Sequence, residues 1–285
     1  MLDRRHRMSA PELFIQTPLE TLATVLSGPV LYVTLNRPEV RNAMSLAMVK
    51  ELMWVLAQAE SDGKVRAIVL RGAGGHFSAG ADLKDMAMAH VAATQSGPVG
   101  VPNAIAAANA QFGELCVAYS KTPLALLVVL EGVVMGGGLG LACVADVVLA
   151  SDTAVFRLPE TSLGLVPAQI APFLLERLGY SQAKRLAVTG GRVDAQQAQI
   201  LGLVHEVHAS DRIDAALVGV LASILTCAPS ALAETKALLI RARFTSGAQL
   251  VRDASDVFAR AAQGPEGLEG VSAFVQKRKP VWVTP

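Results

Sequence analysis

Two glycine-rich segments of the chain have the composition of a site that binds negative charge. RGAGGHFSAGADLKDM at 71–86 follows an apolar run at 65–70, and EGVVMGGGLGLACVAD at 131–146 follows another at 124–130. Each segment leads into a predicted helix, whose first N–H groups lack intrahelical acceptors and whose dipole favours a nearby anion. If the two turns lie side by side, the N–H groups of Ala81 and Gly137 can donate to one oxygen atom, as an oxyanion hole does. Glycine suits this role because the backbone can approach a ligand with no Cβ in the way.

The alternative is that both segments are tight strand–helix connections in which glycine serves only steric needs. A single such turn favours that alternative, whereas two of them favour a site. The sequence argues against a nucleotide-hydrolysing function, because GGGLGLA lacks the Lys-Ser/Thr ending of a phosphate loop. A G-x-G-x-x-G pattern between a strand and a helix is also missing from the sequence.

Three titratable residues stand near these segments in the sequence. Glu160 follows a proline, so it is either a first-turn carboxylate that the helix dipole stabilises or, if partly buried, a general acid/base whose pKa is raised. Asp146 precedes a predicted strand, where an aspartate more often caps a backbone turn. We expect His76 to pack or to form a hydrogen bond rather than to act as a base.

The elements that must position these residues alternate between strands and helices. Short β-type runs at 30–35, 65–70 and 124–130 are separated by longer helical patterns, and later strands are predicted at 146–151 and 203–208. Ser45 is predicted to cap a helix that ends at Gly63. From about residue 210 onward the pattern is helical. The sequence therefore predicts an α/β fold with a flexible tail at 1–18, a core at 19–210 and a helical region at 211–285.

The composition excludes several classes of partner. The net charge is +1 and no basic segment stands out, which argues against a nucleic-acid or anionic-membrane partner. The apolar run 124–130 is far too short to cross a bilayer. Three widely spaced cysteines indicate neither disulfides nor a metal site, so we expect a reducing, cytoplasmic location and no metal.

Five segments, in order, resemble the crotonase superfamily of enoyl-CoA hydratases and isomerases: 35–45, 76–86, 131–151, 156–167 and 274–282. The resemblance extends from about residue 20 to the end of the chain. It implies a spiral of ββα units, a helical C-terminal region used for trimerisation, and a coenzyme A thioester as substrate rather than a permanently bound cofactor. Its carbonyl oxygen would accept hydrogen bonds from Ala81 and Gly137, with Glu160 as the catalytic acid/base.

The same resemblance implies further contacts. Ala43, Ala79, Asp82 and Leu83 match positions that line the coenzyme A path. Lys277 and Lys279 either reach a coenzyme phosphate across a subunit boundary or form a solvated basic tail. We expect a homotrimer or a dimer of trimers, because a helical stripe of apolar residues after residue 211 need not be covered by the core: Leu217, Val220, Leu221 and Ile224.

The chain departs from the typical hydratase pattern at two positions of the predicted substrate pocket. Gly140 stands where hydratases carry a second glutamate, and Gln169 lies in a segment that is glycine-rich in many relatives. Gln169 either faces the acyl group, where its amide could orient water, or faces solvent. The sequence most resembles hydratases of branched glutaconyl-CoA thioesters, of the isohexenylglutaconyl-CoA type. The alternatives are a Δ3,Δ2-enoyl-CoA isomerase that needs one glutamate, and a catalytically silent assembly or RNA-binding relative.

Overall fold

The computed structural model describes residues 18–82, 84, 85, 87, 88 and 103–283. The strands are β1 Leu22–Ser27, β2 Val30–Leu35, β3 Ala67–Gly72, β4 Ala125–Leu130, β5 Val133–Met135, β6 Val147–Ser151, β7 Val155–Arg157, β8 Arg192–Asp194 and β9 Glu206–His208. The α-helices are α1 Leu46–Asp62, α3 Ala104–Lys121, α4 Gly137–Val144, α5 Ala171–Thr189, α6 Ala195–Ile200, α7 Ile213–Leu225, α8 Pro229–Ala242, α9 Gly247–Gln263 and α10 Pro265–Val275. The predicted N-terminal tail, except Pro18, and the predicted coenzyme A residue Leu83 lie outside the described residues.

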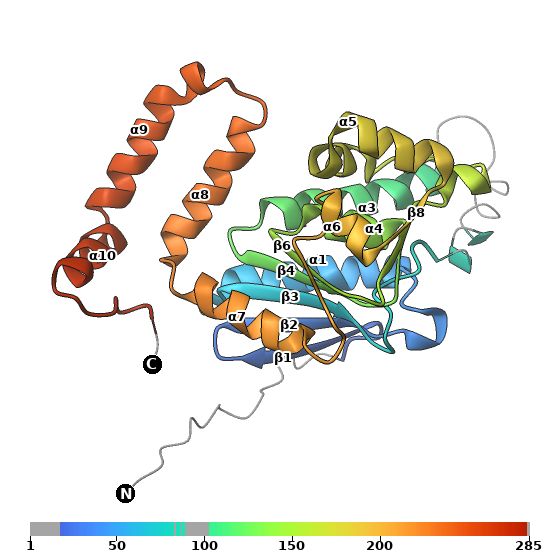
Figure 1. The fold of residues 1–285 in the computed structure, drawn as a ribbon, viewed down its shortest axis with the longest axis horizontal. Helices are drawn as coiled ribbons and strands as arrows, with labels where there is room; N and C mark the ends of the chain where they lie inside the picture. The colour runs from blue at the N-terminus through green and yellow to red at the C-terminus, as the bar shows by residue number, and fades with distance from the viewer. Residues whose placement is uncertain (1–17, 83, 86, 89–102, 284–285) are drawn as a thin grey trace, which may run out of the picture.

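A six-stranded sheet in the order β1-β2-β3-β4-β6-β9 forms the centre of the molecule (Figure 1). β1 and β2 pair antiparallel, and every later pair in this sheet is parallel. β4 is buried along its whole length, which explains its continuous run of apolar residues. The strands predicted at 30–35, 65–70, 124–130 and 146–151 are confirmed within two residues at their ends.

The two faces of this sheet are covered by different helices. Alternate residues of the strands, such as Ile68 and Leu126, join the main core with α1 and α4, while Val69 and Leu127 pack against α7 on the other face. α1 begins at the predicted cap, since Ser45 Oγ accepts from the N–H of Met48.

Part of the apolar stripe on which the trimer prediction rested is buried within the subunit. Leu217 and Leu221 are only 3% and 5% exposed, because they pack on the strands within the same subunit. Val220 and Ile224 pack partly against the same cluster. Leu217 and Leu221 therefore serve to cover the sheet within the subunit, whereas Val220 and Ile224 are covered only in part.

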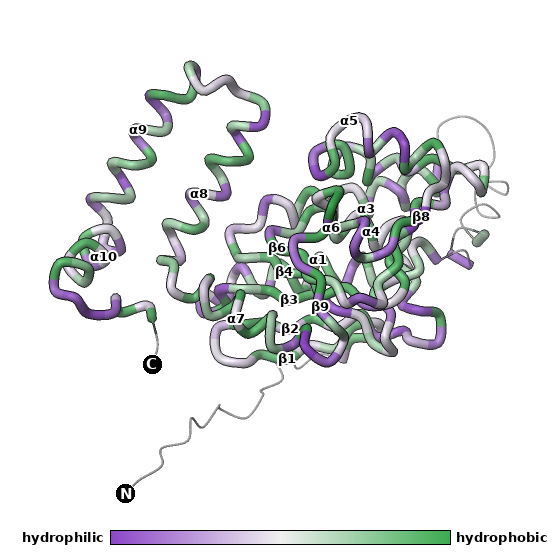
Figure 2. The backbone as a smooth tube through the Cα atoms, viewed as in Figure 1, coloured by the Kyte–Doolittle hydropathy of each residue, from purple (hydrophilic) through white to green (hydrophobic). Residues whose placement is uncertain are grey.

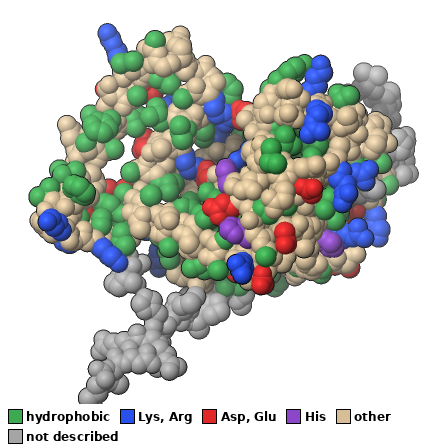
Figure 3. Space-filling model, viewed as in Figure 1, with side chains coloured by type: hydrophobic (Ala, Val, Ile, Leu, Met, Phe, Trp, Pro, Cys, Tyr) green, Lys and Arg blue, Asp and Glu red, His purple; other side chains and the backbone are tan. Residues whose placement is uncertain are grey.

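The helices α8, α9 and α10 form an arm that extends from the core (Figure 1). The arm begins and ends at one place: Arg66 Nη1 donates to the carbonyl of Trp282 at 2.9 Å, and Trp282 Nε1 donates to the carbonyl of Thr226 at 3.0 Å. Hydrophobic and hydrophilic turns alternate along it (Figure 2), and hydrophobic side chains are spread over the face seen in Figure 3. Its large exposed apolar residues include Leu239, Phe244, Val251, Phe258, Leu268, Val271, Phe274 and Val275.

No single helix in the described ranges is long and apolar enough to cross a membrane. The helices α7 and α8, which meet at 97°, pass the criteria of length and composition only as a bent pair.

A second, three-stranded sheet lies beside the first and carries the chemistry-bearing turns. Its order is β5-β7-β8, with β5 and β7 parallel, so Met135 stands beside Arg157 at the ends of the two strands. β5 then runs into Gly136 and α4, and β7 runs into Pro159 and Glu160. Because parallel strands end at the same edge of a sheet, the pairing brings Glu160 to the start of α4.

Candidate active site

The two glycine turns lie side by side, which an oxyanion hole formed by both of them requires. Ser78 and Val134 form a parallel bridge, and the N–H of Met135 donates to the carbonyl of Ser78 at 2.9 Å. Gly80 has φ +91°, and a Cβ on it would lie 3.2 Å from the carbonyl oxygen of Met135. Gly136, with φ +46°, packs back on the Cα of Gly80. Both positions require glycine because of positive φ and close backbone approach.

A third segment, 37–44, holds the first turn from the other side. The N–H of Met44 donates to the carbonyl of Gly80 at 2.8 Å, and the N–H of Asp82 donates to the carbonyl of Met44 at 3.1 Å. The buried Asn42 donates from Nδ2 to the carbonyls of Ala73 and His76. The backbone that carries Ala79 and Ala81 is thus fixed along both edges.

The predicted coenzyme A residues are close to one another here. Arg37 Nη1 donates to the carbonyl of Ala43 at 2.7 Å and to Oδ2 of Asp82 at 2.8 Å. Ala79 donates its N–H to the carbonyl of Arg41 at 2.9 Å. Burial opposes the charge of Asp82, but hydrogen bonds from Arg37 and from the N–H of Lys84 outweigh it and hold the pKa of this carboxyl below its usual value. The Asp82 side chain therefore ties two segments together, which sequence reasoning did not foresee.

The two proposed donors lie on adjacent turns. In the bridge between Met44 and Ala81, the hydrogen bonds are made by the residues on either side of Ala81. Gly137 is the first residue of α4, so its N–H has no intrahelical acceptor. Neither N–H donates to another residue of the described part of the chain. Two backbone donors on adjacent turns are thus available to a ligand.

Glu160 lies directly at the second glycine turn. A Cβ on Gly136 would be 2.9 Å from Oε1 of Glu160, while Oε2 is buried and has no hydrogen-bond partner in the described residues. Glu160 opens a short 3-10 helix, Glu160–Leu163, as the proline before it suggested. Burial raises the pKa of this carboxyl, although a hydrogen bond from its own backbone N–H opposes the shift. A half-buried carboxylate with a raised pKa next to two free donors can exchange protons with a bound ligand.

The space above Gly140 is filled by apolar side chains. A Cβ on Gly140 would overlap Cγ2 of Ile170 and would lie 3.3 Å from Cζ of Phe112. The Phe112 ring also covers Gly137, where a Cβ would lie 3.1 Å from its Cζ. The missing second carboxylate is therefore replaced by a wall of Ile170 and Phe112.

Gln169 is fixed on α3. Its Nε2 donates to Oδ1 of Asn109 at 2.8 Å, and a Cβ on Gly113 would overlap its Oε1. Gln169 is half-buried and is next in sequence to Ile170, which lies with Phe112 over Gly140. It is therefore neither fully exposed to solvent nor fully enclosed, the two alternatives being solvent and the acyl group.

Other residues weighed from the sequence lie elsewhere. Asp146 follows the far end of α4, where Oδ2 accepts from the N–H of Leu126 at 2.7 Å and pairs with Lys236 at 2.5 Å. His76 accepts from the N–H of Val133 through Nδ1 at 3.2 Å, which confirms the expected hydrogen-bonding role. Lys277 and Lys279 are exposed at the end of the arm. The described ranges hold no group of three or more His, Cys, Asp or Glu able to bind a metal ion.

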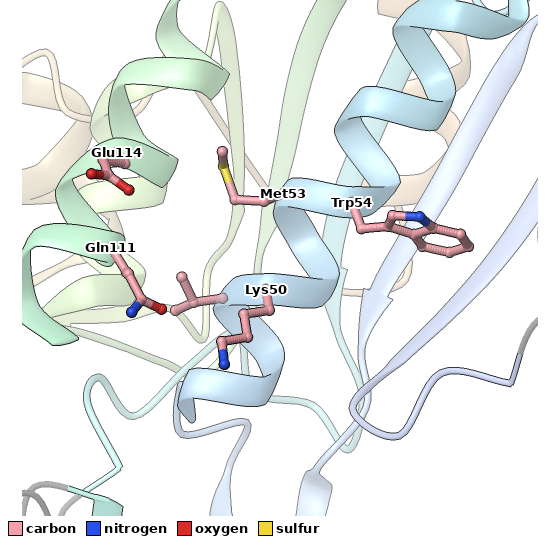
Figure 4. Close-up of a pocket in the computed structure, with 6 residues that line it drawn as sticks. Lys50, Met53, Trp54, Gln111 and Glu114 are labelled. Carbon is pink, nitrogen blue, oxygen red and sulfur yellow. The ribbon is translucent and has the colours of Figure 1, made fainter. Parts of the chain in front are cut away.

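A surface groove of about 410 Å³ lies away from these turns, between α1 and α3 (Figure 4). It is lined by Val49, Lys50, Met53, Trp54, Gln111 and Glu114. None of the residues of the glycine turns lines it.

Sequence reasoning missed Phe112 and Ile170. One signal was present in the sequence: Gly113 sits inside a helix, where glycine is unfavourable unless another group packs closely on it. That group is Gln169, which brings the neighbouring Ile170 over α4.

Comparison with known proteins agrees with this arrangement. The family model described as enoyl-CoA hydratase/isomerase matches residues 26–285. The 2,3-dehydroadipyl-CoA hydratase of Escherichia coli is 32% identical over 88% of this chain and 94% of its own. Two solved structures each align with a TM-score of 0.88 over 93% of this chain and 100% of their own: AtuE of Pseudomonas aeruginosa, 50% identical, and an enoyl-CoA hydratase/isomerase of Marinobacter aquaeolei, 48% identical.

Proposed function

Because the chain belongs to the enoyl-CoA hydratase/isomerase family and is an acyl-CoA enzyme of that type, we propose that its glycine turns bind the thioester group of the substrate. Ala81 and Gly137 donate their N–H groups to the thioester carbonyl oxygen, and Glu160 is the general acid/base. Coenzyme A enters as part of the substrate, along Ala43, Ala79, Asp82 and the neighbouring Leu83.

One observation carries this assignment. The carboxylate of Glu160 lies against Gly136, the residue before Gly137, and its Oε2 is buried with no partner among the described residues. A buried oxygen without a partner is costly in a folded protein, so it is expected where a ligand completes its hydrogen bonding.

The chemistry we propose is hydration of a 2-enoyl-CoA. Glu160 takes a proton from water while the water oxygen bonds to the β-carbon and the π electrons move to the thioester oxygen. The N–H groups of Ala81 and Gly137 stabilise the enolate that forms. Glu160 then returns the proton to the α-carbon, so one carboxylate serves in both steps.

For the acyl group we propose a branched glutaconyl chain, such as isohexenylglutaconyl-CoA. Two features support a branched chain that ends in a carboxylate. Ile170 and Phe112 form an apolar wall above Gly140, which suits a branch. The E. coli relative is named for 2,3-dehydroadipyl-CoA, an acyl chain that also ends in a carboxylate.

A second candidate is Δ3,Δ2-enoyl-CoA isomerisation. The apolar filling above Gly140 favours it, because no second carboxylate is there to hold water, and one base suffices to move a proton between two carbons.

The test is an assay of the purified protein and its Glu160→Gln variant on four thioesters: crotonyl-CoA, a 3-enoyl-CoA, methylglutaconyl-CoA and isohexenylglutaconyl-CoA. We expect the highest kcat/KM for hydration of a branched glutaconyl-CoA, with loss of turnover in the variant. Conversion of the 3-enoyl-CoA alone would favour the isomerase. No turnover on any of the four would favour a catalytically silent relative.

A further inference from the structure

The far end of α4 is held by one guanidinium group. Nη2 of Arg177, from α5, donates to the carbonyls of Ala142 and Cys143, each at 3.2 Å, and to the carbonyl of Ala145. These carbonyls lie at the end of α4 and at its cap Ala145, where a helix lacks intrahelical donors, although the carbonyl of Ala142 also accepts from the N–H of Ala145 at 3.4 Å. Because Ala142, Cys143 and Ala145 are buried, Arg177 supplies a partner that water cannot easily provide.

Within the described part of the chain, the Arg177 side chain has no competing charged partner. Among the described residues it forms no ion pair, since the nearby Asp146 pairs with Lys236. Its Nη1 lies 3.2 Å from Nε2 of His205, and Nδ1 of that histidine accepts from the N–H of Val148 at 2.9 Å. Burial lowers the pKa of Arg177 and of His205, but a guanidinium remains charged in proteins. With Nδ1 accepting, the neutral ring carries its proton on Nε2, so Arg177 packs against this histidine and directs its hydrogen bonds to the end of α4.

The start of the same helix needs outside support. Its cap and two of its first residues are Gly136, Gly137 and Gly138, and Gly140 follows. Glycine is among the weakest helix formers, so eight residues with three glycines have little helical stability of their own. A cation at the C-terminal end favours the helix through its dipole and fixes its axis.

We propose that Arg177 is a positioning residue for the reaction: by binding the carbonyls at the C-terminal end of α4, it fixes the Gly137 N–H at the other end. The inference rests on the proposed role of Gly137 as a donor to the thioester oxygen. Arg177 touches no reacting atom, so its effect on turnover passes through the orientation of α4.

The experiment compares Arg177→Met, Arg177→Lys and the control Arg185→Met. Arg185 lies in the second part of α5, beyond the break at Gly179, is exposed, and its side chain donates only to Gln182 among the described residues. For each variant, kcat and KM are measured on the best substrate of the panel, together with the carbonyl stretching frequency of the bound thioester. That frequency falls when the carbonyl oxygen accepts strong hydrogen bonds.

We expect Arg177→Met to lower kcat by roughly tenfold to a hundredfold, somewhat less than the loss of a whole oxyanion donor. KM should change by less than about threefold, because the coenzyme A portion still binds, and part of the carbonyl frequency shift should be lost. Arg177→Lys should be intermediate, since it keeps the charge but has no planar fork for several carbonyls. Arg185→Met should equal the wild type.

Two results would overturn the inference. One is a folded Arg177→Met protein with wild-type kcat and carbonyl frequency. The other is a loss of kcat with an unchanged carbonyl frequency, which would mean that Arg177 matters for another reason. If Arg177→Met does not fold, Arg177→Lys decides by the same two criteria. A wild type that neither turns over nor shifts the carbonyl frequency of any thioester would instead refute the proposed function itself.

Discussion

At the scale of single residues, Glu160 gives the sharpest test of the proposed chemistry. In Glu160→Gln the shape is kept and proton exchange is lost, so turnover should fall by about 10²–10⁴ while thioester binding persists. Steady-state kinetics and calorimetric binding of a substrate analogue separate these two effects. Near-native turnover would show that Glu160 is only the first residue of a short helix.

The raised pKa of Glu160 also predicts a pH dependence of stability. Burial disfavours its charged form in the folded state, so the native protein loses stability as the pH rises through the raised pKa. At low pH the carboxyl is protonated in both the folded and the unfolded state, and this penalty is absent. The Tm of the wild type relative to Glu160→Gln should therefore decrease from about pH 4 to pH 8, as followed by calorimetry. A pH-independent difference would contradict the raised pKa.

The contact between Gly140 and Ile170 predicts that the effect of a substitution at position 140 depends on the residue at position 170. Gly140→Glu alone should destabilise the fold by about 1–3 kcal/mol, because its Cβ overlaps the Ile170 side chain. In Gly140→Glu/Ile170→Ala that overlap is removed, so hydration of crotonyl-CoA should rise above the wild-type rate. Denaturant unfolding and the crotonyl-CoA assay test both parts. Gly140→Ala/Ile170→Ala is the control without a carboxylate.

The sequence could predict only part of these residue-scale relations. The adjacency of the two glycine turns was left as a condition by the sequence, and the structure shows that it is met. Asp146 was considered as a substitute base, but it follows α4 at the end away from Gly137, about 12 Å along the helix axis. The contact of Ile170 with Gly140 joins residues thirty positions apart through packing on α3, and no local pattern encodes it.

At the scale of elements, α4 connects the proposed donor to the rest of the fold. Gly137→Pro removes the N–H and should lower kcat by at least about 10²–10³. Gly137→Ala is the matched control: its Cβ meets Phe112 in the same way, but the N–H remains. Proline is tolerated at the first position of a helix, so the proline variant should still fold. We expect the alanine variant to keep far more activity, because it alone retains the N–H. Equal losses in the two variants would mean that crowding, rather than the N–H, is responsible.

The elements that sequence patterns could predict are those long enough to show a period. The helix after Ser45 and the strands β2, β3, β4 and β6 of the large sheet are confirmed, whereas β1 was not predicted. The strands of the small sheet are only three residues each, so they carry no readable alternation. The strand predicted at 203–208 is shortened to Glu206–His208. Its first residues serve other contacts: Leu203 and Val204 pack in the core, and His205 bonds to β6.

At the scale of the whole molecule, the predicted crotonase-like α/β fold is confirmed by the solved structures, whereas the assembly stays a prediction. The arm exposes Phe258 at 75% and Phe274 at 85%, which is a large apolar surface for a free chain. We expect a trimer or a dimer of trimers in light scattering. Phe258→Asp with Phe274→Asp should lower the assembled mass, and Val188→Asp, at a 69% exposed position on α5, should not. A wild type that is monomeric at micromolar concentration would refute the prediction.

The parallel pairing of β5 with β7 positions Glu160 and the start of α4, whereas other elements supply the apolar walls above them. Glu160 and the start of α4 extend from neighbouring ends of one strand pair, so their spacing is inherited as a unit. The walls above them come from other elements, Phe112 from α3 and Ile170 from the segment before α5. Under the proposed function, substitutions in those walls would change the fit of the acyl group and leave the positions of Glu160 and Gly137 unchanged. The strand pair would then keep one proton-transfer geometry while the walls vary.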